Sequence, residues 1–275
     1  MPPLAIAFAL TAALLHATWN MVLARSPDTN AAMPVAMLVG SAVLLPLAIG
    51  QWRLDAEAVP YVAVSSTLEL VYFWLLARAY RTADLSLVYP IARGLAPVLV
   101  LVGGALFVGQ HMGPVGVLGV VLVAAGVVLV RGLRSPASSR DVAMAVGIAC
   151  LIASYTLVDQ RVVSHAGTIT YLVLIVGIPA VVYTGVLVAG DRGVARIRAA
   201  ATPGVLAGGI AVVAAYGLVL AALGMAAAAG VAALRETSIV MATVLAAVVL
   251  KERVERSRWL GSIVVVAGIA LVVTS

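Results

Sequence analysis

Residues 85–108, LSLVYPIARGLAPVLVLVGGALFV, form a run long enough to cross a bilayer, yet the run carries a permanent cation, Arg93. A spanning helix needs about 20 apolar residues. An arginine near its centre costs roughly 2.5–3.5 kcal/mol on insertion scales, and such charges usually face a bundle interior or a polar pathway. The stretch therefore predicts a membrane protein with a polar centre.

The composition extends this interpretation to the whole chain. The 275 residues are 64% hydrophobic and 10% charged, against about 45–50% apolar and about 25% charged in soluble domains. The first run lacks the basic region of a signal peptide, so we expect it to be retained. The predicted fold is an all-α polytopic membrane protein with ten transmembrane helices, at residues 4–24, 31–50, 58–80, 85–108, 114–131, 142–163, 168–189, 204–224, 227–250 and 257–274.

The chain contains an internal repeat. Residues 83–130 laid over 225–272 without a gap align Arg93 with Arg235, at an offset of 142 positions. The same offset aligns Gly119 with Gly261 and Gly126 with Gly268. We therefore predict two five-helix repeats, 1–136 and 137–275.

The loop charges predict that the second repeat is inverted, as an odd number of spans requires. Connections after runs 1, 3, 5, 7 and 9, here called the odd connections, hold 13 of the 17 Lys and Arg residues. The opposite side holds only Arg53 and Arg161. Under the positive-inside rule the odd connections are cytoplasmic and both termini lie outside the cytoplasm. The high pI needs no nucleic-acid partner, because the arginines cluster in these short loops.

The last stretch, LKERVERSRWLGSIVVVAGIALVV (250–273), joins an apolar helix ending in Glu252 to a basic turn and a helix with Gly261 and Gly268. It resembles the closing signature of the EamA-like branch of the drug/metabolite transporter superfamily. Residues 95–130 show the same pattern, but Gln110 stands where the family has Glu, and in the second repeat Ile239 replaces a proline.

This resemblance implies a carrier of the cell (inner) membrane with a central cavity lined mainly by helices 1, 3, 4, 6, 8 and 9. Helices 5 and 10 would be peripheral. Their glycines, seven residues apart, favour close helix packing, and these helices could also pair two copies into a homodimer. The segment LLHATWN (14–20) is similar to the first helix of a sub-branch that includes phosphonate-associated members.

Two interpretations of Arg93 and Arg235 stay open. They can form structural ion pairs with Glu69, Asp159 or Glu236. Alternatively, they can bind one anionic substrate from both halves, since the planar guanidinium grips carboxylate or phosphate with two hydrogen bonds. Tyr89 lies one turn before Arg93 and could complete the site.

Further candidates lie on the other cavity helices. His16, Trp19 and Asn20 share one helical face, and His16 could couple proton movement to transport. Glu69 and Asp159 are the other proton-coupling candidates, although Asp159 could instead be solvated near its helix end. The remaining predicted binding residues are aromatic or follow an arginine directly: Tyr72, Trp74, Tyr155, Tyr216 and Glu236.

These features predict a secondary transporter of a small polar metabolite, anionic or zwitterionic, that works by alternating access. Export is the commoner role in the family. The alternatives are a flippase for a lipid-linked anion and a proton-coupled exporter of cations. An enzyme is not expected, because His16 and Cys150 supply no nucleophile–base pair. Neither a metal site nor an ATP-binding loop is present as a sequence motif, so we expect no cofactor.

Overall fold

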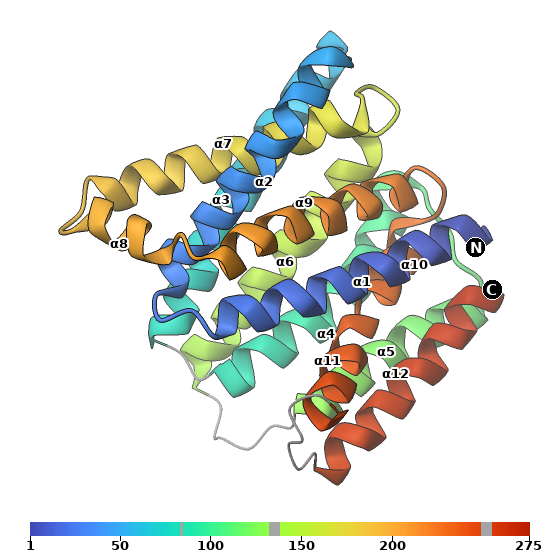
Figure 1. Cartoon of the computed structure of the whole chain (residues 1–275). Helices are drawn as coiled ribbons and strands as arrows, with labels where there is room; N and C mark the ends of the chain where they lie inside the picture. The colour runs from blue at the N-terminus through green and yellow to red at the C-terminus, as the bar shows by residue number, and fades with distance from the viewer. Residues whose placement is uncertain (83–84, 132–137, 249–254) are drawn as a thin grey trace.

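The computed structural model describes residues 1–82, 85–131, 138–248 and 255–275, and it is helical throughout these ranges (Figure 1). A single isolated bridge, between Leu54 and Ala166, is the only strand-like pairing there. The predicted boundary at 136/137 lies outside the described residues, as does Glu252. The side chain of Tyr89 is also outside the described part.

The first half of the chain forms five long helices. Their starts follow ordinary capping rules: the Asp28 carboxylate accepts a hydrogen bond from the Ala31 amide, and Pro114 opens its helix where no amide hydrogen is needed. The elements are α1 (Pro3–Ala24), α2 (Thr29–Gly50), a 3₁₀ turn (Ala56–Ala58), α3 (Val59–Thr82), α4 (Leu85–Gly103), a π-helical turn (Gly104–Val108) and α5 (Pro114–Arg131).

The second half repeats the long helices and adds a short one. Ser138 and Thr202 cap their helices through side-chain oxygens. The elements are α6 (Ser139–Val162), α7 (Thr168–Val188), α8 (Gly193–Ala200), α9 (Pro203–Leu223), α10 (Ala228–Arg235), α11 (Thr237–Val248) and α12 (Arg256–Thr274).

All ten predicted runs fall on helices, but eight of the described helices are long and apolar enough to cross a membrane by themselves. Residues 114–130 form a shorter apolar helix. The run at 227–250 is divided between α10 and α11. The all-helical membrane fold is therefore as predicted, whereas the number of ten crossings stays a prediction.

The division within run 227–250 was not expected from the sequence, which contains neither Gly nor Pro at this point. The helix ends at Arg235 and starts again at Thr237, with Glu236 at the junction. Hydrogen bonds between residues three apart span the junction, from the Glu236 amide to the Ala233 carbonyl and from the Ile239 amide to the Glu236 carbonyl. Discontinuous helices of this kind often form the substrate sites of transporters.

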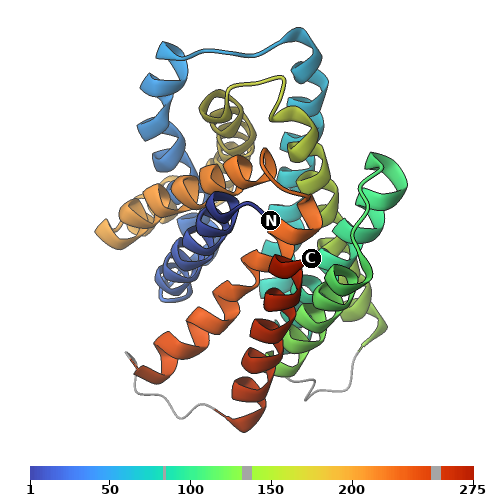
Figure 2. The same cartoon turned by 90° about the vertical axis from the view of Figure 1, so that its right-hand side faces the viewer.

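Helices α5 and α12 pack along their whole length and run antiparallel (Figures 1 and 2). A Cβ atom added to Gly119 would lie 2.6 Å from the Gly268 carbonyl oxygen, and one added to Gly126 would lie 2.8 Å from that of Gly261. Each glycine thus meets the repeat equivalent of the other glycine, which is the pattern of a twofold axis. The predicted close packing through these glycines is confirmed.

This glycine seam, defined by the four glycines at 119, 126, 261 and 268, is buried between the two halves of one chain. Pairing of two copies through α5 and α12 would have to use their other faces, and it stays a prediction. The remaining contacts repeat in the same way, because α1 packs on α9 as α6 packs on α3.

The connections gather on two sides of the molecule. The Met1 amino group lies 3.4 Å from the Val273 carbonyl oxygen, so the termini are adjacent. On the side of the odd connections, α8 is fixed to the start of α2 by Arg196, whose Nε donates to Asp28 Oδ2 at 2.7 Å. This hydrogen bond holds the pKa of Asp28 below its usual value.

Candidate functional site

A cavity of about 100 Å³ lies at the centre of the bundle. It is lined by α1, α3, α4, α6, α9 and α10, and by Met33 of α2. Because α9 is the eighth predicted run and α10 is the first part of the ninth, these six are the helices that the family resemblance implied. Leu23, Met33 and Leu76 lie near the helix ends that face the odd connections. The cavity therefore extends from the centre of the bundle toward the odd connections.

Nine of the predicted binding residues line this cavity. They come from five of the helices predicted to surround it and from the first part of the divided run: His16, Trp19, Asn20, Glu69, Tyr72, Arg93, Tyr155, Tyr216 and Arg235. The fold thus brings together candidates that are up to 219 positions apart in the chain. Their binding roles stay predictions.

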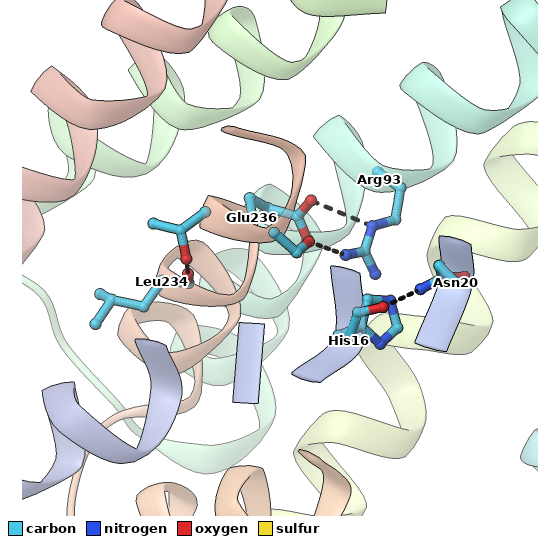
Figure 3. Close-up of polar contacts among 7 residues, drawn as sticks. His16, Asn20, Arg93, Leu234 and Glu236 are labelled. Carbon is cyan, nitrogen blue, oxygen red and sulfur yellow. Dashed lines mark hydrogen bonds and ion pairs between the residues drawn. The ribbon is translucent and has the colours of Figure 1, made fainter. Parts of the chain in front are cut away.

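The polar face of α1 is held by local hydrogen bonds. Trp19 Nε1 donates to His16 Nδ1 at 3.2 Å. Asn20 Nδ2 donates to the His16 carbonyl at 2.7 Å (Figure 3). Because an indole nitrogen can only donate, Nδ1 of His16 must be unprotonated in this arrangement. His16 is therefore a neutral imidazole here, with Nε2 left to carry the hydrogen.

Arg93 of α4 is held by the junction between α10 and α11. Its Nε lies 3.2 Å from Glu236 Oε2, and its Nη2 donates to Ser238 Oγ at 3.2 Å (Figure 3). Both members of the ion pair are buried, with 7% of Arg93 and 4% of Glu236 exposed. The pair connects the two halves of the chain, so the structural interpretation of Arg93 describes its present contacts.

Arg235 has different neighbours although it is the repeat equivalent of Arg93. The position equivalent to Glu236 in the first half is Gly94, so the reciprocal ion pair cannot form. Arg235 is partly exposed, lines the cavity and lies beside Tyr155. Among the residues that the structure describes, it forms no ion pair with a carboxylate.

The carboxylate of Asp159 is buried at the back of the cavity, with 1% of the residue exposed. Its Oδ1 accepts hydrogen bonds from Ser65 Oγ at 2.7 Å and from the Tyr171 hydroxyl at 2.6 Å. The hydroxyl oxygen of Tyr216 lies 2.6 Å from Oδ2. The expectation that Asp159 could be solvated near its helix end was wrong, because α7 and α9 cover it.

Glu69 is joined to the same group. The Tyr216 hydroxyl oxygen lies 3.0 Å from Glu69 Oε1, so this one oxygen contacts two carboxyl groups. The ring of Tyr155 lies between those of Tyr72 and Tyr216, edge-on to the first and tilted to the second, with centroid distances of 6.0 and 6.4 Å. Tyr216 thus joins Glu69, which lines the cavity, to the buried Asp159.

Sequence reasoning missed three residues of the site and misplaced one. Ser65, Tyr171 and Ser238 were not singled out, because a single hydroxyl in an apolar run gives no signal of what it contacts. Trp74, predicted to bind substrate, is 56% exposed on the outside of α3, where the Arg78 guanidinium lies 5.9 Å from the ring centroid. Tyr216, which stands at the same offset of 142 positions from Trp74 in the repeat, instead lines the cavity.

The side of the cavity near the termini is closed by two glutamines. Gln110, at the position where the family has Glu, donates through Nε2 to Gln160 Oε1 and accepts from the Ala228 amide at 3.3 Å. Gln160 Nε2 donates to the Ala226 carbonyl at 3.0 Å. These bonds tie the loop before α5 and the end of α6 to the start of α10.

Comparison with known proteins agrees with this architecture. The model of the EamA-like transporter family matches residues 3–132 and 140–274, which is one copy in each half. A solved crystal structure with 17% sequence identity has a TM-score of 0.76 and covers 97% of this chain and 95% of its own. At that identity the similarity concerns the fold. No curated protein shows significant sequence similarity to the chain.

Proposed function

The chain belongs to the EamA-like transporter family, and from this premise we propose that it is a secondary transporter of a small metabolite carrying a carboxylate or phosphate group. Membership makes it a membrane transporter. The substrate class, the direction and the mechanism are our proposal. The sub-branch suggested by residues 14–20 stays a prediction.

The difference between the two arginines carries the proposal. Arg93 is neutralised by Glu236, whereas Arg235 lines the cavity without a carboxylate partner in the described part of the chain. A guanidinium that lines a confined site and has no carboxylate partner is suited to binding a carboxylate or a phosphate. Glu69 lines the same cavity, so a zwitterion with an amino group would also find a partner.

The size of the cavity favours a small solute over a lipid-linked one. Its volume of about 100 Å³ is below the roughly 300–1,000 Å³ that pockets for drug-sized ligands occupy. A lipid-linked anion would need more space and a lateral opening.

Alternating access is supported by the contrast between the two ends of the cavity. One end extends toward the odd connections, while the glutamines and the adjacent loops close the other. With the odd connections in the cytoplasm, this conformation would load substrate from inside. We therefore propose export across the cell membrane, with both termini outside.

The test compares ligand affinity with stability for the two arginines. Purified protein is screened by thermal shift against small carboxylates, phosphates, zwitterions and cations. A ligand at about 100 times its dissociation constant should raise the free energy of unfolding by roughly 2.7 kcal/mol. Arg235→Lys should weaken binding of the hit at least tenfold with little change in melting temperature, because lysine loses the two-pronged geometry. Arg198→Lys, on the exposed face of α8, is the control and should bind normally.

Two outcomes would contradict the proposal. Unchanged affinity for the hit in Arg235→Lys would remove Arg235 from the binding site. Stabilisation by cations alone would favour the alternative of a cation exporter, with Glu69 as the binding carboxylate.

A further inference from the structure

We infer that Glu69, Tyr216 and Asp159 form a site that holds one exchangeable proton when the cavity is empty. The three residues come from α3, α9 and α6, and Glu69 and Tyr216 line the cavity. The role of this proton in transport rests on the proposed function, but the existence of the site does not.

The argument starts from the number of hydrogens. A tyrosine hydroxyl has one hydrogen to donate, yet the Tyr216 oxygen lies 2.6 Å from Asp159 Oδ2 and 3.0 Å from Glu69 Oε1. If the hydrogen points to Asp159, the contact with Glu69 is a hydrogen bond only when Glu69 carries a proton and donates it. If the hydrogen points to Glu69, the same holds for Asp159. One proton therefore belongs to the pair.

The remaining donors place that proton on Glu69. Asp159 accepts from Ser65 and Tyr171 at its other oxygen, so three donors can stabilise it as a carboxylate. In the described part of the chain, Glu69 has one hydrogen-bond partner, the Tyr216 hydroxyl, which also contacts Asp159. The chain of bonds then runs from the Glu69 hydroxyl to Tyr216 and from the Tyr216 hydroxyl to Asp159.

The charge balance of the cavity also leads to one proton on the acid pair. The two carboxyl oxygens that flank Tyr216 are no more than 5.6 Å apart, the sum of the two distances, and both residues are buried. Two ionised carboxylates in such a site disfavour each other. Arg93 and Glu236 neutralise one another, so one negative charge on the acid pair balances Arg235.

Other titratable groups surround the pair on every side. They are His16 on α1, Tyr72 on α3, Arg93 on α4, Tyr155 on α6, Tyr171 on α7 and Arg235 on α10. His16 and the tyrosines are neutral in this arrangement and Arg93 is paired with Glu236, so Arg235 is the cation that the acid pair balances.

Proton transfer along the chain is balanced in atoms and charge. Glu69 gives its proton to the Tyr216 oxygen while the Tyr216 hydrogen moves to Asp159, so the tyrosine is restored and the negative charge moves from Asp159 to Glu69. An ionised Glu69 would compete with an anionic substrate for Arg235. A protonated Glu69 leaves Arg235 available, which links proton and anion binding in the proposed transport cycle.

Infrared spectroscopy of the purified, ligand-free protein at neutral pH tests the site. We expect the carbonyl band of one protonated, buried carboxyl group, which shifts in deuterium oxide. Glu69→Gln and Asp159→Asn should each remove the band, because either substitution leaves one acid to balance Arg235. Glu57→Gln, at an exposed carboxylate on the surface, should leave it unchanged.

The absence of the band in the unmodified protein, or its survival in either variant, would overturn the inference. Neither result depends on a ligand. A band that behaves as expected in a protein that binds no anion would leave the proton site standing and contradict the proposed function alone. Binding of an anion without the band would do the reverse.

Discussion

At the scale of single residues, Arg93 and Arg235 show how an internal repeat can diverge. They occupy equivalent positions, but only the second half has an acid next to its arginine. Glu236 points away from Arg235, its neighbour in the chain, and pairs with Arg93 of the other half. Both arginines line the cavity, but in the described part of the chain only Arg93 is paired with a carboxylate.

This assignment makes a prediction for stability. Arg93→Gln should lower the melting temperature strongly, because removing one partner of a buried ion pair typically costs about 3–5 kcal/mol. The variant Arg93→Gln/Glu236→Gln should recover much of this loss, since no buried charge is then left without its partner. Melting curves in detergent for the two single variants and the double variant measure the coupling. Additive losses would show that the two side chains do not stabilise each other.

Sequence patterns indicated most of the polar residues that line the cavity but could not supply their partners. The shared face of His16 and Asn20 follows from helical spacing, and nine candidates line the cavity. The burial of Asp159 depends on α7 and α9, which are distant in sequence. The pairing of Arg93 depends on a helix junction that no Gly or Pro announces. The role of His16 in proton coupling stays a prediction.

At the scale of elements, apolar length and repeat offset were sufficient to locate nearly every helix. They were insufficient where a helix is interrupted, because the α10–α11 junction contacts Arg93 through Glu236 and Ser238, and these residues are distant from Arg93 in the sequence. The glycine seam was predictable, since small residues at a seven-residue spacing allow two helices to approach closely. The spacing did not predict which helix each set of glycines contacts.

The seam gives a prediction with a matched control. Gly126→Ala should destabilise the fold, because the added methyl group would lie 2.7 Å from the Val265 amide nitrogen and 2.8 Å from the Gly261 carbonyl oxygen. Gly185→Ala on α7 has no atom within 4 Å of the added group. It should be neutral or stabilising, by up to about 1 kcal/mol from helix propensity. Equal melting temperatures for the two variants would contradict the close contact.

At the scale of the whole molecule, the connections lie on two opposite sides of the bundle. Arg196 meets Asp28 on one side, and the termini meet on the other. The bias of 13 basic residues against 2 assigns the first side to the cytoplasm.

We accordingly predict both termini outside the cytoplasm. A reporter that is active only outside should be active when fused after Ser275, and a reporter that is active only in the cytoplasm should be silent there. The same two reporters inserted in the loop at 190–192 should give the opposite result and serve as the internal control. Cytoplasmic activity at Ser275 would reverse the topology and the side to which the cavity opens.

The glycine seam also bears on how the protein is made. Its two surfaces are backbone against backbone and match each other about a twofold axis, so the fit between the halves does not depend on the peptide that links them. Two half-length chains translated separately should then recognise one another in the membrane. The continuous chain ensures that the two halves are made in equal amounts, because each translated chain contains one copy of each half.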